Sequence, residues 1–431
     1  MKNQVDLVHW DAEELGNHHR ILSERYEAYR EQKISLDMSR GKPCREQLEL
    51  SAPMLQILPP DDPLRAEDGS DCLNYGGLDG IPEAKALFSQ VLGVDPKELL
   101  IGGNSSLTMM HDTLSRAMLH GVYGSELPWG KLPKVKFLCP SPGYDRHFAI
   151  CELLNIEMIV VDMLPGGPDM EQVEQLVRED DSIKGIWCVP KYSNPDGITY
   201  SDETVDRLAR MKTAAADFRI FWDDAYTVHH LTSKPDELKS IHAACRTAGN
   251  PDRVFIFSST AKITFPGAGV AVLASSERNL DLIRRQLAVQ TIGPDKINQL
   301  RHVRFLPDAD HVKRHMEKHA AIIKPKFDLV LQKFEAELGG KQIASWHKPN
   351  GGYFISLNTL DGCAKEVVRM AAEAGVTLTK AGATFPYGRD PRDRNIRIAP
   401  TFPSLAELDT AMDILCLCVQ LASIRKILSE R

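Results

Sequence analysis

The stretch FSSTAKITFPG, residues 257–267, sets a single lysine, Lys262, between two short apolar runs. Residues 254–257 lead into the stretch and residues 270–274 lead out of it, and both runs predict buried strands. Hydroxyl and small side chains surround the lysine, and the Pro-Gly pair that follows indicates a turn. An amine at the end of a buried strand loses hydration, which lowers its pKa and makes it a nucleophile toward carbonyl groups. The fold around this lysine therefore decides its chemistry.

Upstream of this stretch, short apolar runs alternate with helical patterns from about residue 83. Continuous apolar strands separated by helices are typical of a parallel sheet that is covered on both faces. We therefore expect an α/β fold whose large domain has a mostly parallel seven-stranded sheet between helices. The last two runs have no helix between them and are expected to be antiparallel neighbours. The seven runs are residues 98–103, 134–140, 156–162, 184–190, 218–224, 253–259 and 269–275.

The pattern changes near residue 310. A long helical region, residues 311–338, is followed by the strand-like runs GGYFISL and NIRIAPT, which begin at residues 351 and 395. This mixture predicts a second, smaller α+β domain that the N-terminal segment completes. We expect the large domain to span residues 70–310 and the small domain to comprise residues 1–69 and 311–431.

The composition favours a soluble globular protein. The 431 residues are 43% hydrophobic and 26% charged, and the formal net charge is −7. A nucleic-acid-binding domain usually presents a basic face, so no nucleic-acid partner is expected. The N-terminus lacks the apolar core of a signal peptide, and no apolar run reaches the length of a membrane span. Nine cysteines without a CxxC pair suit a reducing compartment, so we expect a cytoplasmic protein with no membrane partner.

Polar residues follow the carboxyl ends of the predicted strands, where ligands bind in open α/β sheets. Asn104, Ser105 and Ser106 open a helix and either bind a phosphate through backbone N–H groups or simply cap that helix. Tyr144 offers an aromatic platform, although most loop tyrosines are packing residues. The run IFWDD places two carboxylates at one strand end, where an inward carboxylate needs a positive or N–H partner.

These features together describe a site for pyridoxal 5'-phosphate. An anion site would hold the phosphate, an aromatic side chain would face the ring, and an aspartate would pair with the pyridinium nitrogen. The lysine would bind the aldehyde as a Schiff base and, once displaced by a substrate amine, move the proton at Cα. The sequence has no metal-ligand spacing such as HExxH, and the adjacent His229 and His230 point apart on an extended chain, so no metal is expected.

Four ordered motifs resemble those of the class I/II, fold-type I pyridoxal-phosphate aminotransferases. They are NPDG at 194–197, DDAY at 223–226 for the pattern Asp-x-Ala-Tyr, STAK at 259–262 for Ser-x-x-Lys, and IRIAP at 396–400. The strings MSRGKP, NYGGLDG, GGNSSLTMMHD and PGYDRHF are more narrowly similar to the aspartate aminotransferase subgroup known as type Ic or MocR-like. The resemblance covers nearly the whole chain and implies the same fold.

The resemblance also implies roles for residues of the cofactor site. Lys262 would carry the cofactor, and Asp223, the first of the two carboxylates, would bind the pyridinium nitrogen. Asn194 and Tyr226 would hydrogen-bond the phenolate oxygen of the ring, and Tyr144 would stack on its face. The phosphate would be held by Asn104, Ser105, Ser106, Ser259 and, from the other subunit of a homodimer with shared active sites, Tyr75.

The substrate side of the site follows from the same resemblance. Arg397 would bind the substrate α-carboxylate with its planar fork, assisted by Asn194, and Gly41 would lie in a loop that closes on the substrate. A dicarboxylic substrate needs a second cation. Arg40, beside Gly41, is the first candidate, although each candidate could instead be a solvated surface charge. The other candidates are Lys42, Lys296 and Arg301.

One departure from the family concerns the phosphate. Many relatives carry an arginine seven or eight residues after the lysine, whereas this chain has Gly269 and Val270 at those positions. Helix N–H groups, hydroxyls or a cation placed elsewhere must then meet the charge of the phosphate.

The resemblance implies an aminotransferase that works by a ping-pong mechanism on an amino acid and a 2-oxo acid. The expected pair is L-aspartate and 2-oxoglutarate, which would give oxaloacetate and L-glutamate. One alternative is a β-lyase or decarboxylase of the same fold, because the orientation of the substrate against the ring decides which bond breaks. Another is the effector-binding module of a MocR-type transcription regulator. That regulator needs an N-terminal winged helix, and the segment before Tyr75 offers room for one helix, SRGKP and a Pro-rich loop, so we expect an enzyme.

Overall fold

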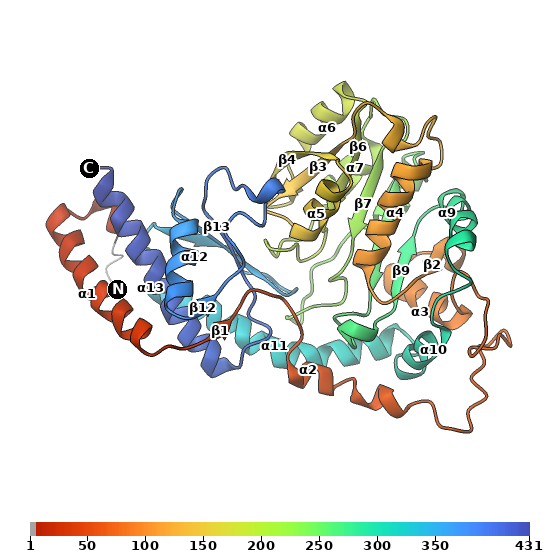
Figure 1. The fold of residues 1–431 in the computed structure, drawn as a ribbon, viewed down its shortest axis with the longest axis horizontal. Coiled ribbons are helices and arrows are strands. Elements are labelled where there is room, and N and C mark those ends of the chain that lie inside the picture. Colours follow the sequence, from red (N-terminus) through yellow and green to blue (C-terminus); the bar gives the residue numbers. More distant parts are fainter. Residues whose placement is uncertain (1–5) are drawn as a thin grey trace.

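The computed structural model describes residues 6–431 and has two parts (Figure 1). One part is built on a large twisted sheet with helices on both of its faces. The other contains helices α1 (Ala12–Glu31), α12 (Ala364–Glu373) and α13 (Leu405–Ser429). Helix α11 (Ala309–Glu337) packs on both parts, because Val312 and Met316 join an apolar cluster of the large sheet and Phe327 joins the cluster of the smaller part. None of the helices in the described chain is long and apolar enough to span a membrane.

The large sheet has the strand order β2-β9-β8-β7-β6-β3-β4-β5. The predicted parallel core is confirmed, since β3, β4, β6, β7 and β8 pair in parallel, and β9 lies antiparallel to β8 as expected. The structure adds an eighth strand of two residues, β5, at the end of the run Pro-Gly-Gly-Pro at 165–168, which is typical of a turn rather than a strand. The strands are β2 (Leu99–Ile101), β3 (Lys136–Ser141), β4 (Glu157–Leu164), β5 (Gly167–Pro168), β6 (Ile183–Cys188), β7 (Arg219–Asp223), β8 (Val254–Ser259) and β9 (Ala271–Ala274).

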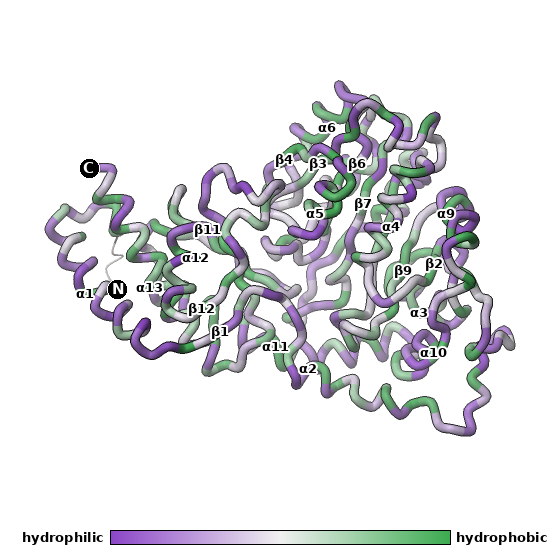
Figure 2. Tube along the Cα trace, viewed as in Figure 1, coloured by the Kyte–Doolittle hydropathy of each residue, from purple (hydrophilic) through white to green (hydrophobic). Residues whose placement is uncertain are grey.

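Helices bury both faces of this sheet, which explains why its strands are continuously apolar rather than alternating. One face packs on α3 (Pro82–Leu92), α6 (Met170–Glu179), α7 (Asp202–Arg210), α8 (Ile241–Thr247) and α10 (Lys296–Phe305). The other face packs on α4 (Ser106–His120), α5 (Asp145–Leu153) and α9 (Glu277–Gln290). The trace coloured by hydropathy shows the contrast between the apolar strand β9 and the polar surface helix α1 (Figure 2).

The smaller part joins the two ends of the chain. Its three-stranded antiparallel sheet consists of β10 (Ala344–Trp346), β11 (Ile355–Thr359) and β13 (Asn395–Ile398). A second pairing is parallel and links the N-terminal β1 (Leu36–Asp37) to β12 (Val376–Thr377). After β1, the short helix α2 (Arg45–Glu49) returns the chain toward the large sheet. The N-terminal segment thus completes the smaller part as expected, whereas the boundaries at residues 69–70 and 310–311 stay a prediction.

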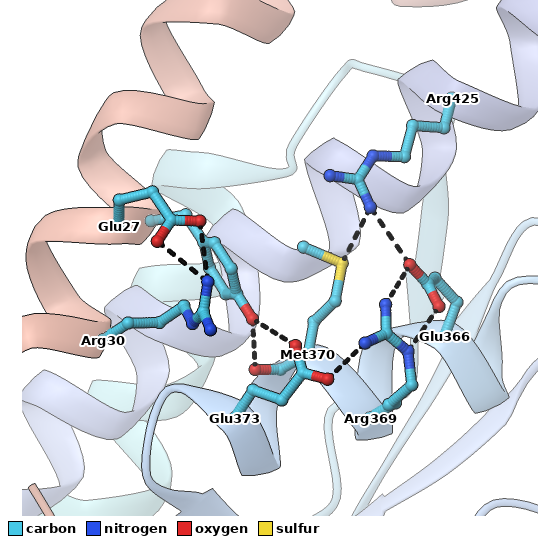
Figure 3. A network of polar contacts seen from close by, with 8 residues as sticks. Glu27, Arg30, Glu366, Arg369, Met370, Glu373 and Arg425 are labelled. Carbon is cyan, nitrogen blue, oxygen red and sulfur yellow. Dashed lines mark hydrogen bonds and ion pairs between the residues drawn. The ribbon is translucent and has the colours of Figure 1, made fainter. Parts of the chain in front are cut away.

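A polar network ties α1 to α12 and α13 at the outer surface of the smaller part (Figure 3). The hydroxyl of the buried Tyr26 donates to the carbonyl of Met370 at 2.9 Å and to Glu373 at 3.2 Å. Arg369 pairs with Glu366 and Glu373 along α12, and Arg425 reaches Glu366 at 3.1 Å. The ion pairs are largely solvated and each contributes little to stability, so the buried tyrosine contact is the stronger link.

We expect Leu415→Ala to destabilise the protein by about 2–5 kcal/mol, because it leaves a cavity in the core of the smaller part. Leu415 has no exposed surface and belongs to the apolar core of the smaller part. Leu405→Ala, in the same helix at a side chain that is 45% exposed, is the matched control and should change stability little. Thermal unfolding of both variants measures the difference, and equal melting temperatures would contradict the proposed packing.

Candidate active site

The carboxyl ends of strands β3, β7 and β8 meet the start of α4 around one polar cavity of about 230 Å³. Because neighbouring parallel strands end at the same edge of a sheet, segments far apart in sequence converge there. The cavity brings together a large share of the predicted site. The predicted site residues that line it are Gly41, Lys42, Ser105, Ser106, Tyr144, Asp223, Ser259 and Lys262.

Lys262 lies in the turn that follows β8, half-buried against aromatic rings. Its Nζ donates a hydrogen bond to the hydroxyl of Tyr226 at 3.2 Å and lies 4.5 Å from the centre of that ring. Burial lowers the pKa of Lys262 below the usual lysine value, and Arg397 lowers it further, whereas Tyr144 and Asp223 oppose the shift. Burial raises the pKa of Tyr226, so its hydroxyl stays protonated and can donate a hydrogen bond. The amine is therefore more readily neutral than an exposed lysine.

The backbone of the lysine turn is held by buried side chains that the sequence did not reveal. His315 on α11 lies 2.9 Å from the carbonyl of Ile263, and His319 lies 3.1 Å from His315. Gln47 on α2 donates to His319 at 3.0 Å and to the hydroxyl of Tyr353 at 2.9 Å. Burial lowers the pKa of both histidines, that of His319 to about 3, so they are neutral. The turn is thereby fixed to both the N-terminal segment and α11.

Asp223 at the end of β7 lines the cavity, whereas the next residue, Asp224, does not. Asp223 Oδ2 lies 3.0 Å from Nε2 of His147, and its buried Oδ1 has no hydrogen-bond partner within residues 6–431. His147 stacks on Trp187 with ring centres 4.2 Å apart, which fixes the imidazole. An unsatisfied buried carboxylate oxygen requires a donor, so it fits a protonated ring nitrogen.

Asp224 has a different environment from its neighbour. Burial raises the pKa of Asp224 to about 6, and Lys191 and Thr227 only partly oppose the shift. His147 was missed in the sequence, although it lies one helical turn after Tyr144 at the start of α5 and could have been expected on the same side. Of the two carboxylates, Asp223 is the one that lines the cavity, and its role stays a prediction.

Hydroxyl groups line the far side of the cavity at the start of α4. Ser105 caps this helix by accepting a hydrogen bond from the amide of Leu107 at 3.2 Å, and Ser106 is its first residue. Ser259, the last residue of β8, accepts from the amide of Ala261 at 3.4 Å. Asn104 is exposed and contributes its backbone rather than lining the cavity. The helix N-terminus and hydroxyls form a suitable anion site.

Gly269, one of the two positions at which the resemblance leads us to expect an arginine, is closely packed by backbone atoms. A Cβ atom at Gly269 would lie 2.8 Å from the carbonyl oxygen of Asn104 and 3.0 Å from the amide nitrogen of Ala261. No side chain fits at this position without moving the chain. Lys42 is the additional cation that lines the cavity, and its Nζ lies 3.8 Å from the centre of the Phe402 ring.

Arg397 on β13 is buried beside the site. Its Nη1 donates to Oδ1 of Asp145 at 2.8 Å and to Oδ1 of Asn194 at 3.3 Å. The guanidinium lies 4.9 Å from the centre of the Phe354 ring. A Cβ atom at Gly41 would lie 2.4 Å from the same ring, so glycine is required where the N-terminal loop crosses it. Arg397, Asn194 and the loop therefore form one connected group.

The remaining predicted residues lie outside the cavity. Arg40 is exposed and Tyr75 is 81% exposed on its loop. Lys296 is buried and donates to the carbonyls of Asn74 at 2.7 Å and Gly76 at 2.6 Å, so it holds the loop of Tyr75 rather than offering a free charge. Arg301 donates to Asn298. Within the described chain, no three His, Cys, Asp or Glu side chains are grouped so that they could hold a metal ion.

The sequence profile of the aspartate amino-transferase family matches residues 11–431 of this chain. The chain belongs to that family. The predicted family is thus confirmed, while the type Ic or MocR-like subgroup stays a prediction.

A curated protein and a solved structure are similar along nearly the whole chain. The aspartate aminotransferase of Corynebacterium glutamicum is 43% identical over 421 residues, which cover 98% of this chain and 97% of the relative. The crystal structure of an aspartate transaminase from C. glutamicum has a TM-score of 0.96 and 42% identity, and the match covers 99% of this chain and all of that one. Fold type I is therefore confirmed.

A more distant structure shares the fold and contains a cofactor derivative. The α-aminoadipate aminotransferase of Thermus thermophilus, in complex with N-(5'-phosphopyridoxyl)-L-leucine, has a TM-score of 0.73 at 19% identity. The match covers 92% of this chain and 94% of that one.

We expect Lys262 to react with acetic anhydride at a lower pH than an ordinary lysine. Only the neutral amine reacts, and the lowered pKa of Lys262 increases the neutral fraction below the ordinary midpoint of about 10.4. The labelling rate of the cofactor-free protein, followed at Lys262 by mass spectrometry, should rise with pH and level off below that midpoint. Lys262→Arg removes the signal and serves as the control. A midpoint at or above the ordinary value would contradict the desolvated site.

Proposed function

We propose that this chain is a pyridoxal-phosphate-dependent aminotransferase that moves the amino group of L-aspartate to 2-oxoglutarate. The observation that carries the proposal is one cavity lined by a desolvated lysine amine, a helix N-terminus and an aspartate whose buried Oδ1 has no partner among residues 6–431. The 43% identical C. glutamicum relative, named aspartate aminotransferase, supports the same activity.

The residues of the cavity fit pyridoxal phosphate. Ser105, Ser106 and Ser259, with the N–H groups at the start of α4, would hold its phosphate. Asp223 Oδ1 would accept from the protonated ring nitrogen, and Tyr144 would cover the ring face. When bound, this cofactor supplies an aldehyde that takes up an amino group and a ring that withdraws electrons from the substrate.

Each residue of the chain then has a defined task. Arg397 binds the α-carboxylate of the amino acid and so orients its Cα–H bond toward the lysine side of the site. The Lys262 amine, whose pKa burial lowers, removes the Cα proton in its neutral form and holds it for return to another carbon. His147 keeps the Asp223 carboxylate in place, and Tyr226 donates from its protonated hydroxyl. A cofactor that keeps the amino group between the two half-reactions would give ping-pong kinetics.

The two alternative functions, a lyase or decarboxylase and a regulator module, have less support than amino transfer. A β-lyase or decarboxylase would use the same lysine and aspartate, but the whole-length relative is named for amino transfer. The family profile of an enzyme covers residues 11–431, so an effector-binding role in a regulator is not favoured.

We also propose a homodimer in which Tyr75 completes the site of the partner subunit. Tyr75 is 81% exposed, and Lys296 fixes its loop from within. Leu73, Val289 and Ile292 are also exposed by 61% or more, and apolar exposure of this kind is typical of an interface. Nine buried cysteines without disulfides suit the reducing cytoplasm, where we place the protein.

Lys262→Ala should abolish turnover of L-aspartate with 2-oxoglutarate by a factor of at least about 10⁴, because both the covalent anchor and the proton carrier are lost. A coupled assay of oxaloacetate measures turnover, and absorbance spectra report whether the cofactor is still held. Leu405→Ala is the control variant with an intact site. Turnover by Lys262→Ala within tenfold of the wild-type rate would refute the proposed role of the lysine.

Mixed dimers test the shared site. Subunits with Tyr75→Ala supply an intact Lys262, and subunits with Lys262→Ala supply an intact Tyr75. Random mixing of the two variants should restore about a quarter of the wild-type activity, because half of the dimers are mixed and each mixed dimer has one complete site. Unfolding and refolding the mixture exchanges the subunits. If the Tyr75→Ala variant alone is impaired and the refolded mixture regains no activity, Tyr75 acts within its own subunit.

A further inference from the structure

The guanidinium of Arg397 already holds a carboxylate from its own chain. Asp145 Oδ1 accepts from Nη1 at 2.8 Å, and the side chains of Arg397 and Asp145 are 7% and 32% exposed. Asp145 is the first residue of α5 and directly follows Tyr144, which lines the cavity. The arginine that the proposed function assigns to the substrate carboxylate is therefore occupied.

A count of N–H donors shows how little of the guanidinium is free. Arginine has five N–H groups, and a carboxylate binds best to two of them at once. Nη1 donates to Asp145 and Asn194, while Nε and Nη2 lie 3.4 and 3.3 Å from the hydroxyl of Thr379. Within residues 6–431, one N–H of Nη2 is left without a partner. A substrate carboxylate can use Nη1 and Nη2 together only when Asp145 releases Nη1.

Other contacts keep Arg397 in place when Asp145 leaves. The ring of Phe354 lies 4.9 Å below the guanidinium. The hydroxyl of Thr379 donates to the carbonyl of Ser39 at 2.7 Å, so its oxygen is fixed toward Arg397. Asp145 in turn has an alternative environment, because the free N–H groups and the dipole at the start of α5 stabilise a negative charge.

We propose that Asp145 is a resident competitor for the carboxylate-binding face of Arg397. The substrate carboxylate exchanges with Asp145, which stays in the first turn of α5. The exchange keeps the charge of Arg397 balanced before and after binding, and it weakens the binding of substrates and products alike. Asp145 thereby sets the affinity for α-carboxylates and favours release of the product. This inference rests on the proposed function of Arg397.

Calorimetric binding of succinate tests the inference, because this dicarboxylate has no amino or oxo group and cannot react. With the cofactor-loaded protein, Asp145→Asn should bind succinate about 3–10 times more tightly than the wild type, since the competing charge is gone. The KM values for L-aspartate and 2-oxoglutarate should fall by a similar factor, while kcat stays equal or decreases. Asp202→Asn, at the first position of α7, loses an exposed carboxylate at an equivalent helix position and should leave binding unchanged.

Two further variants separate the possible failures. Arg397→Met should lose succinate binding, and Asp145→Asn should give no gain in that background. If Arg397→Met binds succinate as tightly as the wild type, the proposed function of Arg397 fails and this inference fails with it. If Arg397→Met loses binding but Asp145→Asn and Asp145→Ser bind succinate equally or more weakly than the wild type, Asp145 only positions the arginine and the inference alone is refuted. Melting temperatures confirm that each variant is folded.

Discussion

The burial of a single amine at the edge of a parallel sheet is the constraint on which the rest of the site depends. Lys262 follows β8, which is covered on both faces, and its turn is fixed by Tyr226, His315 and the side chains behind them. Desolvation lowers its pKa, and no carboxylate pairs directly with its Nζ among the described residues. The amine of Lys262 is therefore more readily deprotonated than that of an ordinary surface lysine.

Charge balance links this amine to the two other ionic groups of the site. Asp223 is held by His147 and has one buried oxygen without a partner within residues 6–431, whereas Arg397 is held by Asp145. This oxygen of Asp223 can accept a further hydrogen bond. The proposed exchange would replace Asp145 by a substrate carboxylate at Arg397. Both contacts come from the first turn of α5. His147 of this turn contacts Asp223, and Asp145 contacts Arg397.

Much of the fold could be predicted from the sequence, because continuous apolar strands and intervening helices are local patterns. The order of motifs also predicted Lys262, Asp223 and Arg397 as site residues, and their roles stay predictions. The partners of these residues could not be predicted, since His147, His315 and Asp145 reach them only through tertiary packing. Lys296 illustrates the same limit: its charge suggested a substrate contact, but its Nζ is committed to the carbonyls of the Tyr75 loop.

The fate of nitrogen in a half-reaction tests the central claim most directly. The cofactor-loaded protein is mixed with ¹⁵N-labelled L-aspartate in the absence of any 2-oxo acid, and the products are quantified by NMR and mass spectrometry. An aminotransferase should give one equivalent of oxaloacetate per subunit. The ¹⁵N should stay on the protein-bound cofactor and pass to glutamate when 2-oxoglutarate is added. Release of labelled ammonia, of alanine or of carbon dioxide in place of retained nitrogen would contradict it.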